Sequence, residues 1–368
     1  MKKILLIDDS PLMRRVISDI INATNEYCVA YTAINGLEGL TILREHDDIL
    51  AVFCDINMPG MDGISLLRIA KDEGMKPPFI MCSSSNDAHD TISALECGAI
   101  EFIKKPENIY RHGQFFDSRI LRALQAAEEV YNKGYVQQRT VAHVDVSAQQ
   151  SVPPKAPVKQ TRERMQVTNN RTTKTNHSKL VALVCSTGGP RALQYVIPKL
   201  PKNLAAPVLI VQHMPVGFTA SLAARMNELS EIRVKEAEDG EKITNGVCYI
   251  AKGGTHLAVT TEPGVTRIKF DDTPPIVGLK PCGNIMYNSL HDVSYDEIVC
   301  VVLTGMGADG TKGIQELSKH KPIYVIAQDE ASSTVYGMPK AIYESGLTDC
   351  VCDINKIAQE IVKKVGVL

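Results

Sequence analysis

Short apolar runs alternate with helix-like segments over the first third of the chain. Between the runs, segments such as Pro11–Ala23 and Gly36–Arg44 carry apolar residues at the spacing of one helix face. Strands that alternate with helices favour a parallel sheet with right-handed crossovers. The pattern therefore predicts an α/β domain of the doubly wound (βα)5 type, closed by a helix from about Gln114 to Asn132. The predicted strands are Lys3–Ile7, Cys28–Thr32, Ile49–Cys54, Phe79–Cys82 and Glu101–Lys104.

The periodic pattern disappears between about residues 134 and 179. This stretch is rich in Gln, Thr, Asn, Pro and Lys, and has no aromatic residue after Tyr135. Such a composition cannot bury enough apolar surface to offset the entropy of ordering. A solvated spacer is therefore favoured over a basic segment that binds an acidic partner. We predict a first domain over residues 1–130, a flexible linker over 131–178 and a second domain over 179–368.

The alternation of strand and helix returns after residue 180. Helices are expected at Arg191–Leu200, Thr219–Glu228 and Gly310–Lys319. This pattern predicts a second, larger Rossmann-like α/β domain with a mostly parallel sheet. Its predicted strands are Leu180–Cys185, Val208–Gln212, Cys248–Ile250, His256–Thr260, Ile298–Leu303 and Ile323–Ala327.

Composition narrows the class of protein. A length of 368 residues favours two domains, and 44% apolar with 22% charged residues is typical of a soluble globular protein. The formal net charge of −2 gives no reason to expect nucleic acid or a membrane as a partner. The apolar run before Asp8 is too short for a signal peptide, so we expect a cytoplasmic protein. The ten cysteines have no zinc-site spacing and are expected to be reduced and mostly buried.

Acidic side chains follow two strands of the first domain. Asp8 and Asp9 end the first strand and Asp55 ends the third. In a doubly wound sheet these ends converge at the topological switch point. Three neighbouring carboxylates repel one another unless a cation neutralises them, and oxygen ligands suit Mg²⁺. Ser83 and Lys105 end the fourth and fifth strands, where a hydroxyl and an ammonium could hold the oxygens of a phosphoryl group.

These strand ends resemble the motifs of two-component receiver domains over about residues 1–125. The matching stretches are Ile7-Asp8-Asp9-Ser10, Asp55-Ile56-Asn57-Met58-Pro59-Gly60-Met61-Asp62-Gly63 and Lys104-Lys105-Pro106. The resemblance implies that Asp55 accepts a phosphoryl group from a histidine kinase. It also implies that Phe102 takes the place of the family's switch aromatic. The implied ligands are Asp8, Asp9, Asp55 and the Asn57 backbone carbonyl for Mg²⁺, with Ser83 and Lys105 for the phosphoryl oxygens.

The second domain carries a serine, a histidine and an aspartate after three of its predicted strands. Its first strand runs directly into Ser186, His213 ends the second, and Asp309 lies in the glycine-rich loop after Leu303. Serine is a weak nucleophile until a base removes its proton, and a carboxylate orients such a base best. Each residue taken alone also fits a turn or a satisfied polar group. The accessible backbone of the loop near Met306 would suit an oxyanion site.

Together these segments resemble the catalytic domain of the chemotaxis protein-glutamate methylesterase (CheB) family. The matching stretches are Ser186-Thr187-Gly188-Gly189-Pro190, Gln212-His213-Met214-Pro215, Gly217-Phe218-Thr219, Glu236 to Gly240, Thr304 to Gly310 and Gln328 to Ser333. The resemblance implies a triad of Ser186, His213 and Asp309, with the Met306 N–H and Thr187 supporting the oxyanion. It also implies hydrolysis of glutamate methyl esters, and deamidation of certain glutamines, on methyl-accepting chemotaxis receptors. A chemotaxis histidine kinase would be the phosphodonor, and hydrolysis would need no cofactor.

Two segments depart from the family pattern. Val184-Cys185 stand where the family usually has Gly-Ala, and Lys280-Pro281-Cys282-Gly283-Asn284 stand where it typically has Arg-Pro-Ser-Val-Asp. In the family the second segment lines the substrate side of the site, so its altered polarity bears on substrate preference and on catalytic efficiency. Other functional classes remain as alternatives: a non-catalytic response regulator that binds receptors, a transcriptional regulator, or an esterase of small metabolites. For the enzyme, we expect the unphosphorylated receiver to pack on the second domain and restrict access to Ser186.

Overall fold

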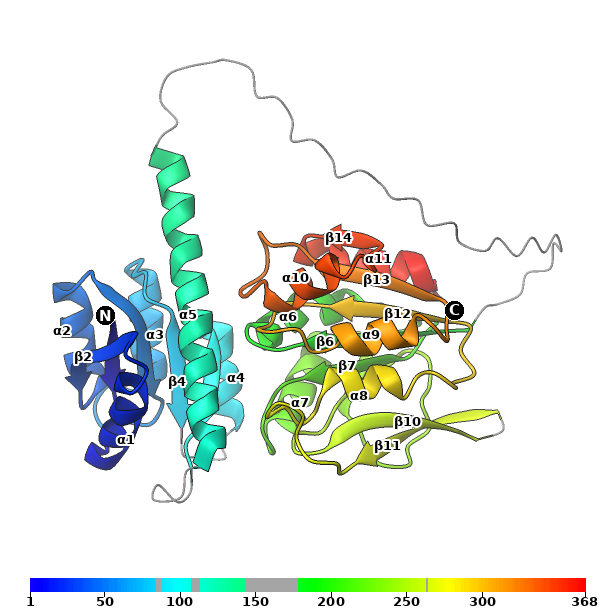
Figure 1. Ribbon diagram of the computed structural model, residues 1–368, viewed down its shortest axis with the longest axis horizontal. Helices are drawn as coiled ribbons and strands as arrows, with labels where there is room; N and C mark the ends of the chain where they lie inside the picture. The colour runs from blue at the N-terminus through cyan, green and yellow to red at the C-terminus, as the bar shows by residue number, and fades with distance from the viewer. Residues whose placement is uncertain (84–87, 107–112, 143–177, 263) are drawn as a thin grey trace, which may run out of the picture.

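The computed structural model describes residues 1–83, 88–106, 113–142, 178–262 and 264–368. These residues form two α/β domains that lie side by side, the first built on strands β1 to β5 and the second on β6 to β14 (Figure 1). The main sheet of each domain is parallel and has buried apolar side chains on both faces. Both domains therefore have the α/β architecture that the sequence predicts.

The first domain has a parallel sheet in the order β2-β1-β3-β4-β5. Alternate residues of β1 pack on opposite faces of this sheet, as expected for a strand covered on both sides. Ser10, Asn35 and Asp62 cap α1, α2 and α3, each accepting a backbone N–H three residues ahead. The strands are β1 Lys2–Ile7, β2 Tyr27–Ala33, β3 Ile49–Asp55, β4 Phe79–Ser83 and β5 Glu101–Lys104, and the helices are α1 Pro11–Asn22, α2 Gly36–Glu45, α3 Gly63–Asp72, α4 Ala88–Cys97 and α5 Gly113–Ala142.

Helix α5 is longer than the sequence pattern predicts. It continues past Asn132 to Ala142, through part of the stretch predicted as linker. Gly134 weakens a helix, but the following Gln, Arg and Ala residues all favour one. The remainder of the predicted linker, residues 143–177, lies outside the described residues.

The second domain has a seven-stranded parallel sheet in the order β14-β13-β12-β6-β7-β9-β8. The predicted strand beginning at His256 lies outside this sheet, since β10 pairs with β11 as a separate antiparallel hairpin. The strands are β6 Lys179–Cys185, β7 Val208–Gln212, β8 Arg233–Glu236, β9 Val247–Ile250, β10 His256–Glu262, β11 Val265–Asp271, β12 Glu297–Val302, β13 Ile323–Gln328 and β14 Cys350–Cys352. The helices are α6 Gly189–Val196, η2 Ile197–Lys199, α7 Thr219–Leu229, α8 Gly283–Asn288, α9 Thr311–Leu317, α10 Gly337–Glu344 and α11 Ile354–Val365.

The chain reverses its winding direction between β6 and β12. From β6 it proceeds through β7 toward β8 on one side, and from β12 through β13 toward β14 on the other. Open α/β sheets bind their ligands in the crevice at the carboxyl ends of the strands at such a switch point. The loops that follow β6, β7 and β12 meet at this crevice.

The first domain packs its α4, β5 and α5 side against the second domain (Figure 1). Phe102 of β5 and Phe218, just before α7, are both buried, and their ring centroids lie 4.8 Å apart. Buried apolar residues of the two domains form one continuous cluster across this interface. The interface therefore has an apolar core as well as polar contacts.

Helix α8 begins directly against β6. A Cβ atom added to Gly283 would lie 2.7 Å from Cγ2 of Val184, a distance that side chains do not tolerate. The family resemblance implies a small residue at 184 and valine at 283, and relative to that expectation the sizes at the two positions are exchanged in this chain. The exchange keeps the volume between β6 and α8 filled.

This exchange predicts coupled stabilities. Gly283→Val should destabilise by about 1–3 kcal/mol through overpacking, and Val184→Ala by about 2 kcal/mol through lost packing. The double variant should be at least about 1 kcal/mol more stable than the sum of the two losses, since the smaller side chain at position 184 makes room for the larger one at position 283. Urea denaturation of the four proteins measures this coupling. Strictly additive losses would contradict the close packing of these positions.

Candidate active site

Ser186 lies on a sharp turn at the carboxyl end of β6. Gly188 adopts a left-handed conformation with φ of 75°, and the Gly189 N–H donates to the Ser186 carbonyl over 2.7 Å. The Ser186 N–H in turn donates to the Thr304 carbonyl over 3.0 Å. A Cβ atom on Gly305 would lie 2.8 Å from that of Ser186, so glycine is required for this approach. The turn thus holds a partly exposed hydroxyl at the edge of the sheet.

Gln212 anchors this turn from the end of β7. Its side-chain amide is buried, donates to the Ser186 carbonyl over 3.0 Å and accepts from the Cys185 thiol over 3.0 Å. The amide oxygen occupies the place that a Cβ atom on Gly189 would take. The sequence prediction did not assign a role to Gln212. The feature of the sequence that could have indicated this role is a polar residue at the end of an otherwise apolar strand.

His213, directly after β7, forms a hydrogen bond with Asp309 from the loop after β12. The distance from Nε2 of His213 to Oδ2 of Asp309 is 2.7 Å, and the two side chains are only 7% and 5% exposed. An ionised carboxylate can only accept, so Nε2 must carry the proton. Nδ1 is buried and has no hydrogen-bond partner among the described residues. In the neutral imidazole, Nδ1 is then the nitrogen without a proton, and it could act as a base.

The Asp309 carboxylate accepts three further hydrogen bonds from the start of α8. The Gly283 N–H donates to Oδ2 over 2.6 Å, while the Asn284 N–H and the Cys282 thiol each donate to Oδ1 over 3.1 Å. Burial alone would raise the pKa of Asp309, but the His213 contact and the bonds from Cys282 and Gly283 hold it well below its usual range. The carboxylate is therefore ionised throughout the neutral range.

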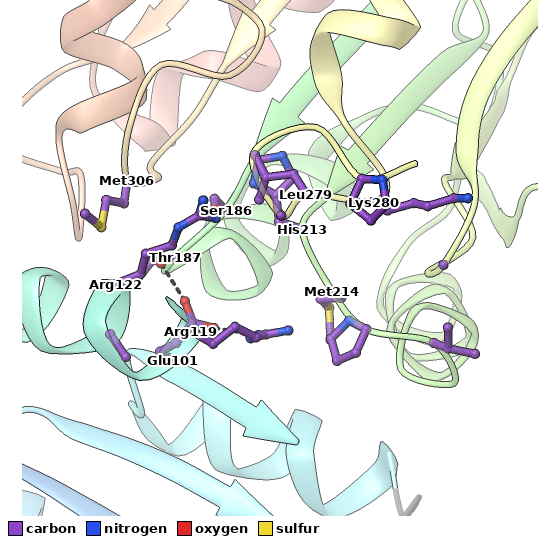
Figure 2. Close-up of a pocket in the computed structure, with 16 residues that line it drawn as sticks. Glu101, Arg119, Arg122, Ser186, Thr187, His213, Met214, Leu279, Lys280 and Met306 are labelled. Carbon is purple, nitrogen blue, oxygen red and sulfur yellow. Dashed lines mark hydrogen bonds and ion pairs between the residues drawn. The ribbon is translucent and has the colours of Figure 1, made fainter. Parts of the chain in front are cut away.

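Ser186 and His213 line one cavity of about 380 Å³. Met306 lines it too, and its backbone N–H has no acceptor among the described residues. Figure 2 shows Ser186, His213 and Met306 around this space. No hydrogen bond joins the Ser186 hydroxyl to His213 in the described part of the chain, and such bonds often tighten only when substrate binds. The cavity brings together a hydroxyl, a base and a free backbone donor.

The first domain forms one wall of this cavity. Glu101 of β5 and Arg119 and Arg122 of α5 line it opposite Ser186 (Figure 2). Glu101 accepts a hydrogen bond from the Thr187 hydroxyl over 2.5 Å. Thr187 is thus held by the first domain in this arrangement. The sequence carries no signal for these partners, because nothing in it specifies which domain surfaces meet.

Further polar contacts join the two domains. Glu96 of α4 pairs with Arg225 of α7 over 2.7 Å. Glu129 of α5 accepts the Tyr336 N–H over 2.7 Å, and Lys133 donates to the Ser333 carbonyl over 3.1 Å. The first domain is thus docked through polar as well as apolar contacts.

The acidic cluster predicted in the first domain is present. Carboxylate oxygens of Asp8, Asp9 and Asp55 lie within 4.8 Å of one another. Lys105 contacts both Asp8 and Asp55 at 2.6 Å. Burial raises the pKa of Asp55, with a further contribution from Asp8 that opposes the effect of Lys105. One ammonium does not balance three carboxylates, so the oxygen-rich cluster fits a divalent cation.

The other residues predicted at this site lie on the same edge of the sheet. Ser83 is buried at the end of β4, and its carbonyl accepts the Lys105 N–H over 2.8 Å. Asn57 is exposed two residues after Asp55.

Among the described residues, no helix has both the length and the apolar character needed to cross a bilayer.

Family models match both domains. Residues 181–361 match the CheB methylesterase model, and residues 4–112 match the response regulator receiver domain. A protein-glutamate methylesterase/protein-glutamine glutaminase of Geobacillus kaustophilus is 36% identical over 99% of both chains. One of the same name from Desulfotalea psychrophila is 39% identical over 99% of this chain and 98% of its own.

The chain belongs to the CheB methylesterase family. A crystal structure of the Thermotoga maritima CheB methylesterase catalytic domain is 41% identical, with a TM-score of 0.50, and covers 51% of this chain and 99% of that one. The receiver and methylesterase domains of this CheB family member are thus those expected from the sequence.

The segment that departs from the CheB pattern lies mainly against the Asp309 carboxylate. Cys282, Gly283 and Asn284 all donate to Asp309, whereas Lys280, two residues earlier, lines the cavity. The segment is therefore divided between the cavity wall, at Lys280, and the support of Asp309, at Cys282, Gly283 and Asn284. Their N–H and thiol groups point at the carboxylate, so the substitutions alter its support.

The Asp309 contacts predict a pH-dependent contribution to stability. Asp309→Asn places an amide NH₂ among N–H donors and should lower the free energy of unfolding at pH 7 by about 2–3 kcal/mol. Because the folded-state pKa of Asp309 lies below the unfolded value near 4, its stabilisation is complete above that value and falls as the pH drops further. The difference between wild type and variant should therefore shrink below about pH 4 in urea titrations.

The exposed Asp292 of the same domain offers a matched control. Asp292→Asn should change the free energy of unfolding by less than about 0.5 kcal/mol at either pH. An Asp309→Asn variant as stable as wild type at pH 7 would contradict the arrangement of donors.

Proposed function

We propose that this protein is a phosphorylation-controlled, cytoplasmic esterase that hydrolyses glutamate methyl esters, and deamidates certain glutamines, on methyl-accepting chemotaxis receptors. The observation that carries the proposal is the His213–Asp309 hydrogen bond, which uses Nε2 and leaves Nδ1 without a partner among the described residues, beside the cavity that both His213 and Ser186 line. A nucleophile, a base and an orienting carboxylate are the minimum set for acyl transfer.

In the proposed mechanism, Nδ1 of His213 accepts the Ser186 proton as the hydroxyl oxygen attacks the γ-carbonyl carbon of the substrate. The N–H of Met306 donates to the resulting oxyanion, with Thr187 beside it as support. His213 then protonates the leaving methanol or ammonia. Water, deprotonated by the same nitrogen, hydrolyses the acyl-serine, so either substrate leaves a glutamate side chain. No cofactor takes part in this hydrolysis.

Asp309 stabilises the imidazolium that forms in each half-reaction. Its 2.7 Å contact with Nε2 lies in a nearly water-free environment, where charge interactions are stronger than in solvent. The bonds from Cys282, Gly283 and Asn284 keep the carboxylate ionised and fixed. Asp309 therefore acts as an acceptor, while proton transfer remains on His213 and Ser186.

Control by phosphorylation would begin at Asp55, which accepts a phosphoryl group from a chemotaxis histidine kinase. Asp8, Asp9, Asp55 and the Asn57 backbone carbonyl would hold Mg²⁺, which neutralises charge on the transferring group. Ser83 and Lys105 would contact the phosphoryl oxygens.

The docked receiver explains how such a charge change could reach Ser186. Lys105 directly follows β5, the strand that carries Glu101 and Phe102 into the domain interface. New contacts of Lys105 with a phosphoryl group would draw it from Asp8 and shift this strand. Changing a docked-to-released ratio from 99:1 to 1:99 requires about 5.5 kcal/mol, and smaller shifts give graded activation.

The alternative of a non-catalytic receptor-binding regulator does not account for the His213–Asp309 pair. A protein that only binds has no need for a buried His–Asp hydrogen bond whose remaining ring nitrogen lacks a partner. The family assignment likewise favours an enzyme.

The decisive test is methanol release from methylated receptor in membranes, with a small phosphodonor and Mg²⁺ present. Wild type should release methanol, and Ser186→Ala should lower the rate at least about 10⁴-fold. Ser294→Ala, at an exposed serine of the same domain, should match wild type. Methanol release that persists in Ser186→Ala would overturn the assignment of the nucleophile.

A further inference from the structure

A tight two-residue turn forms part of the rim of the active-site cavity. The Ile276 N–H donates to the Leu279 carbonyl over 3.1 Å, and the Leu279 N–H donates back over 2.9 Å. The two residues between them, Val277 and Gly278, have φ values of 51° and 75°. Positive φ at both central positions defines a type I′ turn, which favours Asn, Asp or Gly at each of them.

Valine is the wrong residue for its position in this turn. A β-branched residue at positive φ is a conformational outlier that costs about 1–3 kcal/mol. In the described part of the chain only one other non-glycine residue has positive φ, and it is Asn25, a residue type that tolerates this conformation. The geometry of the turn therefore does not explain why valine occupies this position.

Packing within the molecule does not explain the valine either. Val277 is 79% exposed, so its side chain recovers little free energy from burial. Ile276 and Val216 are also exposed, at 41% and 60%. Val216, Gly278 and Leu279 line the cavity that contains Ser186. Apolar side chains thus project to solvent from the rim of this cavity.

Docking of the receiver does not require the valine side chain either. Arg122 of α5 donates a hydrogen bond to the backbone carbonyl of Val277. Any residue in this turn would offer the same carbonyl. The contact shows instead that a helix can approach the turn beside the cavity. Dissociation of the receiver would expose both the surface of this turn that faces Arg122 and the cavity that contains Ser186.

We propose that Val277, with Ile276 and Val216, forms a docking surface for apolar side chains that flank the modified glutamate on the protein substrate. Val216 and Gly278, the neighbour of Val277, line the cavity that contains Ser186, so side chains close to a glutamate in this cavity would meet the rim. Val216 lies close to Gly254, since a Cβ there would lie 2.3 Å from its Cγ2. The inference rests on the proposed function.

The test is Val277→Asn, which keeps the backbone turn and its carbonyl but removes the apolar side chain. Under activating conditions, KM for methylated receptor should rise about tenfold while kcat changes less than about twofold. Hydrolysis of a small ester, N-acetylglutamate γ-methyl ester, should be unchanged. The melting temperature should rise by a few degrees, since asparagine accepts positive φ. Val351→Asn, at a partly exposed valine of β14, should leave both KM values unchanged.

Three results would overturn the inference. One is a more stable variant with an unchanged KM for receptor. Another is an equal loss on receptor and on the small ester, which would indicate a distorted site. The third is a higher unstimulated rate without a change of KM, which would assign the side chain to the receiver interface.

Direct binding separates this inference from the proposed chemistry. Receptor membranes should bind Ser186→Ala more tightly than Ser186→Ala/Val277→Asn, again by about tenfold. Weaker binding of the double variant supports the surface even if the wild type releases no methanol. Equal binding by the two proteins would count against it.

Discussion

The buried carboxylate of Asp309 is the constraint on which the site depends. A charge removed from water must be met by donors, and four converge here: the imidazole of His213, the Cys282 thiol and two backbone N–H groups of α8. Meeting that requirement brings together the loop after β12, the end of β7 and the start of α8. It also fixes the imidazole tautomer. The proposed catalytic chemistry therefore follows from how one buried charge is satisfied.

The crevice at the switch point serves a second purpose. The receiver covers it with β5 and α5, so Glu101 and Arg119 line the cavity, while Lys105, directly after β5, contacts Asp8 and Asp55. Only a few residues of β5 therefore lie between Lys105, which contacts the acidic cluster, and Glu101, which lines the cavity of Ser186. The apolar contact between Phe102 and Phe218 lies between them. This proximity gives a physical basis for graded control.

Much of this could be predicted from the sequence, because strand ends carry the chemistry. Long apolar strands such as β6 and β12 were predicted to within one residue, and they placed Ser186 and Asp309 at the sheet edge. The short edge strands β8 and β14 were missed, since their few, partly exposed residues form no recognisable pattern. The partners of Asp309 on α8, the receiver residues that line the cavity and the conformation of Val277 all depend on tertiary contacts. No local pattern encodes those.

The account is tested most directly by the rate at which a small fluorophosphonate modifies Ser186 in the full chain with Mg²⁺, read by mass spectrometry. Modification should be slow before a small phosphodonor is added and at least about tenfold faster afterwards, equivalent to about 1.4 kcal/mol. Asp55→Asn should remove that acceleration. An equal rate with and without the phosphodonor would contradict control by a receiver that can dissociate from the site. No modification of Ser186 in either state would contradict a reactive serine.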